Sequence, residues 1–169
     1  LPLAGVLLFG WDTGRILLVY WAESAIVGVF NVLRLVLVGR WAALVYAPFF
    51  VGHYGAFMAV HLMFIYGFFI RGPRAGFHVP LAAVAGEFRQ LWPALLGLAA
   101  SHAVSFVSNF IGRGEYRRTT AQAQMNAPYR RIVVMHLTVL FGSWLCLASG
   151  GTTPALALMV LLKTAIDVR

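Results

Sequence analysis

Long apolar segments alternate along the chain with short stretches that contain glycine, proline or charged residues. The central segment, residues 42–70, contains no Asp, Glu, Lys or Arg. A bilayer hydrocarbon core is about 30 Å thick and a helix crosses it with about 20 apolar residues, so this segment is long enough to cross with some tilt. We therefore interpret it as a membrane-spanning helix around which the other segments are arranged.

The same pattern predicts further helices on both sides of the central segment. The predicted spans are residues 1–10 (the stub of a truncated first helix), 15–38, 42–70, 92–111, 129–149 and 155–168. Residues 77–91 mix apolar side chains with Glu87 and Arg89, a pattern typical of an amphipathic helix in the membrane interface. Residues 11–14 read as a turn and residues 112–128 as the one properly polar loop.

The composition agrees with a membrane protein. Hydrophobic residues make up 61% of the chain and charged residues 11%, whereas ordinary globular chains carry about 25% charged residues. The sequence opens at Leu1 directly in apolar residues, without the positively charged segment that begins a signal peptide, so no signal peptide is predicted. We expect the chain to start inside a helix. The predicted fold is an all-α, polytopic transmembrane helix bundle of about six spans plus one interfacial helix, with residues 1–169 as a single domain.

The formal net charge of +8 is explained by membrane topology. With six spans, one side of the membrane carries nine of the 13 basic residues. They are Arg34, Arg40, Arg113, Arg117, Arg118, Arg130, Arg131, Lys163 and Arg169. By the positive-inside rule that side is cytoplasmic, so we expect a multi-pass protein of the cell (inner) membrane with both termini in the cytoplasm. The charge then needs no nucleic-acid partner, and residues 113–118 can contact anionic lipid headgroups at about 1 kcal/mol per charge.

Each long span carries polar side chains that a hydrocarbon core cannot solvate. They include Glu23, Asn31, His53, His61, His102, Ser105, Asn109 and His136. His102 and Asn109 are seven residues apart and share a helix face, with Ser105 beside them. At about 1.5 Å per residue, the depths of the others define two layers. The predicted inner layer is His53, His102 and His136, and the predicted outer layer is Glu23 and His61.

Histidines on three separate helices match the ligand set of a catalytic zinc site, in which a fourth coordination position stays open. The residues assigned as metal ligands are His53, His61, His102 and His136. Glu23 is a further ligand or the general base that takes a proton from metal-bound water. Asn31, Ser105 and Asn109 are then expected to orient the imidazoles. The first hypothesis is a zinc-like transition-metal site in a membrane enzyme or metal-binding protein.

Three alternatives stay open beside the metal site. Glu23 and the histidines can line a proton, ion or substrate path of a transporter or channel. His53 and His102 can ligate a b-type haem from both sides. The histidines can also simply join helices in a structural subunit, alone or as a homo-oligomer. Whether the protein is an enzyme is left undecided, because the sequence has no G-x-S-x-G, H-E-x-x-H or nucleotide-binding glycine motif.

Several other features have a packing explanation. The pairs Gly52/Ala56 and Gly55/Ala59 are small residues four apart and allow another helix to approach His53 closely. Glu23 and Arg34 are nearly aligned on one helix and can form a neutralised pair. Features that receive no role in the chemistry are His78, the single Cys146, and the i,i+4 pair Lys163 and Asp167 at the end of the chain.

One resemblance covers most of the chain. It is carried by Tyr20-Trp21-Ala22-Glu23, Asn31, His53-Tyr54-Gly55, His61, Ser101-His102, Ser105-Phe106 and Asn109-Phe110. These residues resemble an uncharacterised family of small prokaryotic multi-span membrane proteins, a domain of unknown function. The resemblance implies a membrane helix bundle and supplies no activity.

Overall fold

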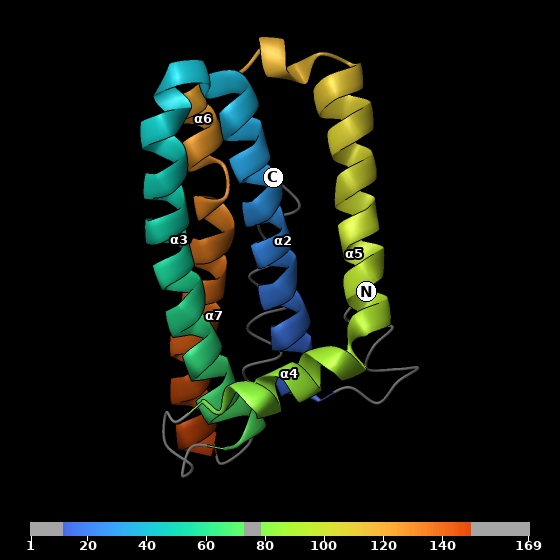
Figure 1. The fold of residues 1–169 in the computed structure, drawn as a ribbon. Helices are drawn as coiled ribbons and strands as arrows, with labels where there is room; N and C mark the ends of the chain where they lie inside the picture. The colour runs from blue at the N-terminus through green and yellow to red at the C-terminus, as the bar shows by residue number, and fades with distance from the viewer. Residues whose placement is uncertain (1–11, 73–78, 150–169) are drawn as a thin grey trace. The chain divides into compact units, whose positions relative to one another are not determined.

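The computed structural model describes residues 12–72 and 79–149 (Figure 1). Every regular element within these two ranges is a helix, which confirms the all-α fold class for this part of the chain. Several sequence predictions concern residues outside these ranges. They are the helices at residues 1–10 and 155–168, the pair Lys163 and Asp167, and His78.

The first described helix, α2 (Thr13–Gly39), leads through the short 3₁₀-helix η1 (Arg40–Ala42) into α3 (Ala43–Phe64). The chain reverses direction at η1 (Figure 1). Of the turn predicted at residues 11–14, Thr13 and Gly14 are instead the first residues of α2. Asp12 Oδ1 accepts a hydrogen bond from Arg15 N at 2.9 Å and so caps this helix start. The central apolar segment is helical to its end, because the π-helix η2 (Ile65–Ile70) continues α3.

The predicted interfacial helix is α4 (Leu81–Gln90), which begins four residues later than expected because Pro80 stands in extended backbone immediately before it. Two polar contacts join α4 to the first turn of α2. Arg15 Nη2 donates to Gln90 Oε1 at 3.0 Å, and Arg15 Nε lies 3.5 Å from Glu87 Oε2. The charged face of α4 is therefore engaged with α2.

The next predicted span is α5 (Trp92–Ser105), continued by the π-helix η3 (Phe106–Gly112). The segment predicted as a polar loop contains two short helices, η4 (Glu115–Arg117) and α6 (Ala121–Asn126). The second forms because Thr120 accepts a hydrogen bond from Ala123 N at 3.2 Å, an N-cap that the sequence analysis did not use.

The last described helix, α7 (Tyr129–Ser149), has the predicted bounds.

The chain forms two compact units, and α2, α3 and α7 each contribute to both. Unit 1 comprises Leu1–Trp21, Val60–Leu91 and Val133–Arg169, and unit 2 comprises Ala22–Ala59 and Trp92–Ile132. In the described part of unit 1 the buried apolar side chains include those of Leu17, Ile65 and Met135. In unit 2 they include those of Phe50 and Phe110. Whether the chain is a single domain in solution stays a prediction.

Two helical stretches are long and apolar enough to cross a membrane, by length and composition alone. They are Thr13–Ile70, which contains both α2 and α3, and Trp92–Gly112. Only 11% of the apolar window in Trp92–Gly112 is buried within the molecule. Among the described residues, these two stretches are the candidate spans, so the predicted six spans are not supported there.

Among the described glycines of unit 2, Gly28 has the tightest surroundings. A Cβ atom built on Gly28 would lie 2.8 Å from Tyr54 Cε1, and the Tyr54 hydroxyl is held by a 2.9 Å hydrogen bond to Ser24 O. The sequence predicts that another helix approaches α3 closely at Gly52 and Gly55. The structure shows no such contact, because a Cβ atom at either glycine would meet nothing within 4 Å. The close contact is thus made by α2 against an aromatic ring of α3.

We predict that Gly28→Ala destabilises the protein, because the Tyr54 ring is pinned and cannot move aside cheaply. The expected loss is about 1–3 kcal/mol of unfolding free energy, the usual cost of overpacking. Gly52→Ala is the matched control. It faces open space, and the gain in helix propensity should leave stability unchanged or raise it by up to about 1 kcal/mol. Thermal unfolding of both variants in detergent tests this, and equal midpoints for the two would contradict the packing described.

Candidate functional site

Three helices of unit 2 meet at the carboxylate of Glu23, on α2. Glu23 Oε1 lies 2.8 Å from Arg131 Nη2, on the first turn of α7, and 3.9 Å from His102 Nε2, on α5. The three side chains are 20%, 30% and 27% exposed, so all are largely withdrawn from the surface. The 2.8 Å contact is a charge-assisted hydrogen bond, whereas 3.9 Å is beyond hydrogen-bond range. Glu23 is therefore bonded to Arg131 and only close to His102.

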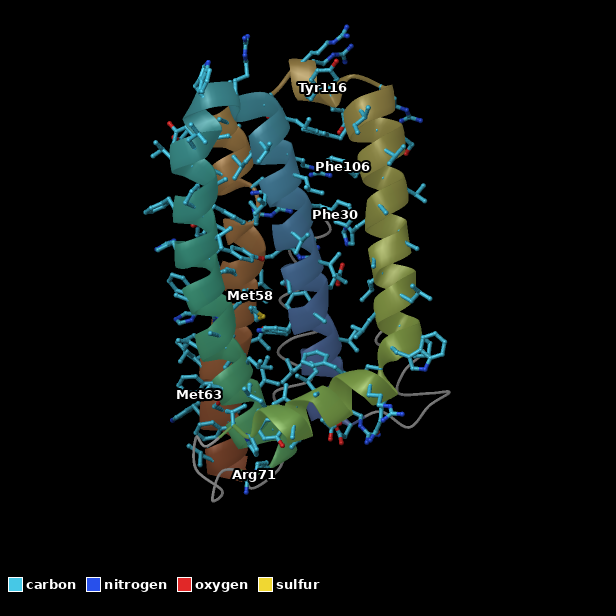
Figure 2. The ribbon with its side chains drawn as sticks, viewed as in Figure 1. Phe30, Met58, Met63, Arg71, Phe106 and Tyr116 are labelled. Atoms are coloured by element: carbon cyan, nitrogen blue, oxygen red, sulfur yellow. The ribbon has the colours of Figure 1, made fainter. Side chains whose placement is uncertain are left out.

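The His102 imidazole also packs against an aromatic ring of α2. Its centroid lies 6.3 Å from that of Phe30, and Phe30 in turn contacts Phe106 at 5.6 Å. Figure 2 shows Phe30 and Phe106 on the facing sides of α2 and of the helix that continues α5. One side of His102 is thus apolar, and Glu23 provides its close ionisable neighbour.

The residues expected to orient the imidazole of His102 do not bond it. Asn109 Nδ2 donates to Ser105 Oγ at 3.3 Å, so these two side chains satisfy each other one turn apart. Asn31, the third such residue, is 2% exposed, and its Nδ2 has no hydrogen-bond partner among the described residues. The expected supporting role of these three side chains is not seen in unit 2.

His53, also in unit 2, is paired with a phenol. His53 Nδ1 lies 2.7 Å from the Tyr129 hydroxyl, and the imidazole stacks on Phe49 with centroids 5.4 Å apart. His53 is exposed, and Tyr129 also touches the ring of Phe50 at 6.2 Å. This histidine is therefore held by an aromatic cluster on α3 and α7.

Unit 1 contains a pair of histidines. His61 Nε2 lies 3.1 Å from His136 Nδ1, with the rings nearly perpendicular at 84°. His61 is 2% exposed, whereas His136 is exposed. A hydrogen bond between two neutral imidazoles needs one ring nitrogen as donor and the other as acceptor. The pair therefore joins a buried group on α3 to an accessible one on α7.

The predicted layers are wrong in these contacts. The prediction puts His136 in the inner layer with His53 and His102, but the partner of His136 is His61. It puts Glu23 in the outer layer with His61, but Glu23 lies beside His102. The depth of a residue, counted from the helix end, does not predict these pairings, because it does not show which way each helix is turned about its own axis. Across residues 12–72 and 79–149, no three His, Cys, Asp or Glu side chains are grouped so that they could hold a metal ion.

The predicted pairing of Glu23 with Arg34 is also wrong. Glu23 bonds Arg131, and the guanidinium carbon of Arg34 lies 5.1 Å from the centroid of the Phe110 ring. In the sequence, Arg131 contributes only to the excess of basic residues on the predicted cytoplasmic side. Its place in the first turn of an apolar helix indicated that Arg131 could be partly buried and would then need a partner. That the partner is Glu23 follows only from the packing of α7 against α2.

Comparison with known families matches residues 1–169 to a family of unknown function. The chain belongs to DUF6498. This confirms the predicted membership of an uncharacterised family, over the whole chain, whereas prokaryotic origin and membrane location stay predictions. No curated protein and no solved structure matches the chain. Because DUF6498 is a family of unknown function, membership assigns no activity, and the function must be argued from the contacts above.

Proposed function

We propose that this DUF6498 protein is a multi-span integral membrane protein. Its long helices support this: α2 has 27 residues, α3 has 22 and α7 has 21, against about 20 needed to cross a bilayer. The outward faces of the helices are apolar. Exposed side chains include Leu44, Val45, Val51, Leu96, Val104, Val107, Val133, Phe141 and Leu147. Apolar surface of this extent is suited to lipid contact.

The proposed topology is six spans in the inner membrane with both termini cytoplasmic, which puts residues 113–118 in the cytoplasm and Arg71 on the opposite side. In a Cys146→Ser background, we expect Arg117→Cys to react with a membrane-impermeant maleimide only in inverted vesicles. Arg71→Cys should react only in right-side-out vesicles. Labelling of both positions from the same side would contradict this topology.

Within this membrane protein, we propose that Glu23 and His102 form part of a proton path. An ionisable residue inside a membrane span is costly and is most often functional. The supporting observation is the 3.9 Å separation of Glu23 Oε1 from His102 Nε2, which an approach of about 1 Å converts to a hydrogen bond able to carry a proton. Arg131 holds the carboxylate in place.

The test is proton flux into proteoliposomes that contain a trapped pH-sensitive dye, after a pH step at clamped membrane potential. We expect Glu23→Gln and His102→Ala each to lower the flux about tenfold or more, because each removes a proton-carrying group. Arg113→Gln changes an exposed arginine outside the cluster and should leave the flux unchanged.

Wild-type flux equal to that of protein-free vesicles would overturn the proton path. Such a result, with Glu23→Gln and His102→Ala lowering only thermal stability, would support the structural role for these side chains.

A metal centre is the second candidate, and the His61–His136 pair favours it. Their facing nitrogens are 3.1 Å apart, close to the separation of two imidazole ligands of one zinc ion. A complete site would require further ligands besides these two. Under this proposal, protein purified without added metal contains about one equivalent of zinc, which His61→Ala removes and His53→Ala does not.

Elemental analysis provides this measurement, and the absorption spectrum of the same sample tests haem through its Soret band. Less than about 0.1 equivalent of any transition metal, unchanged after zinc is added, would exclude the metal centre.

A further inference from the structure

Two buried donor groups on one face of α2 have no acceptor among residues 12–72 and 79–149. Asn31 and Arg34 are three residues apart, so their side chains are neighbours on the helix surface. Asn31 Nδ2 and Arg34 Nε are both buried, and neither has a hydrogen-bond partner within the described part of the chain. Buried donors are nearly always paired, because an unpaired one has lost its hydrogen bonds to water without a replacement. These two donors therefore indicate a missing acceptor.

The charges around Arg34 indicate that the acceptor is an anion. Glu23 lies 2.8 Å from Arg131 and is thereby already neutralised. Unit 2 holds seven arginines and two glutamates, a formal excess of five positive charges, and the second glutamate, Glu115, is exposed among the arginines of the 113–118 segment. A water molecule could satisfy the amide of Asn31 but would leave the guanidinium of Arg34 without a counterion.

The surroundings of Arg34 suit a bound oxyanion. The guanidinium carbon lies over the Phe110 ring, 5.1 Å from its centre, and a guanidinium on an aromatic face can still donate from its edge. Phe110 in turn contacts Tyr116 at 6.3 Å. Figure 2 shows Tyr116 beyond Phe106, on the segment that carries Arg113, Arg117 and Arg118.

Arg34 lies near the end of α2 that adjoins this segment. A Cβ atom at Gly39, the last residue of α2, would lie 3.6 Å from Ala121 Cβ at the start of α6. Five residues separate Arg34 from Gly39, which places Arg34 about 7–8 Å from the helix end at 1.5 Å per residue. An oxyanion could reach Arg34 from this end of unit 2 without crossing the whole helix.

We propose that Asn31 and Arg34 bind a phosphate group. The guanidinium edge donates to two phosphate oxygens and the Asn31 amide donates to a third, in the geometry that arginine offers to phosphate. The phosphate belongs either to a lipid headgroup or to a small soluble phosphate compound. The site needs only the helix packing of unit 2, so it stands or falls independently of proton movement through Glu23 and His102.

Two arms of one experiment distinguish the sources. In the first, the full chain in a neutral detergent is titrated with inorganic phosphate against chloride at equal ionic strength, and binding is measured by calorimetry. In the second, the protein is placed in nanodiscs of phosphatidylcholine with increasing phosphatidylglycerol, and retained phospholipid is identified by native mass spectrometry. The variants are Arg34→Gln and Asn31→Ala, with Arg89→Gln, an exposed arginine of α4 in unit 1, as the control.

We expect saturable binding in one arm, weakened about tenfold or more by Arg34→Gln and several-fold by Asn31→Ala, because a lost charge-assisted bond costs more than a lost amide bond. Arg34→Lys should recover part of the affinity, since it keeps the charge without the planar edge. Arg89→Gln should change the affinity less than about twofold. Binding in the first arm identifies a soluble phosphate compound, and binding in the second arm alone identifies a lipid headgroup.

The proposal is overturned if neither arm shows binding, or if both site variants bind as the wild type does. Should Arg34→Gln fail to fold, Asn31→Ala alone decides the outcome. Glu23→Gln separates this site from the proton path, because it should lower proton flux about tenfold or more and keep phosphate binding. Arg34→Gln should weaken phosphate binding and keep the flux.

Discussion

The carboxylate of Glu23 is the constraint on which the arrangement of unit 2 depends. In a helix bundle this apolar, a charged group can be accommodated only if another element supplies the opposite charge. Arg131 does so at 2.8 Å, and this contact brings the start of α7 to the middle of α2. His102 of α5 faces the same carboxylate at 3.9 Å. The polar residues therefore determine which helix faces meet, while apolar packing stabilises the contact.

The described histidines also have partners on neighbouring helices, but these partners differ in chemical type. Each histidine in the described part of the chain has a specific neighbour: a phenol for His53, a second imidazole for His61 and His136, and a carboxylate for His102. These are different chemical environments, and they argue for separate roles more strongly than for one shared metal. Asn31 and Arg34 differ from these histidines, since each keeps a buried donor without an acceptor in the described residues, as Arg131 Nε also does. An incomplete site of this kind is a natural place for a ligand.

Sequence patterns predicted the helices well and their contacts poorly. The bounds of α7 and the continuous helical path through residues 43–70 follow from apolar runs that end at glycine, proline or arginine. The short α6 was missed because its signal is a single capping threonine in a polar stretch. The Gly52 and Gly55 motif was misleading, because a small-residue pattern shows where a helix can approach and not whether one does.

The sequence by itself determined the helical class, the main helix bounds, the family and the set of polar residues placed in apolar helices. The helical class, the helix bounds and the polar positions depend on local composition or on the period along one helix, whereas the family depends on residues spread over the chain. Only the tertiary structure decided that Glu23 bonds Arg131 and not Arg34, that His136 bonds His61, and that Gly28 receives the Tyr54 ring. Those pairings depend on how each helix is rotated about its own axis, and that rotation is set by neighbours more than 25 residues away in the chain.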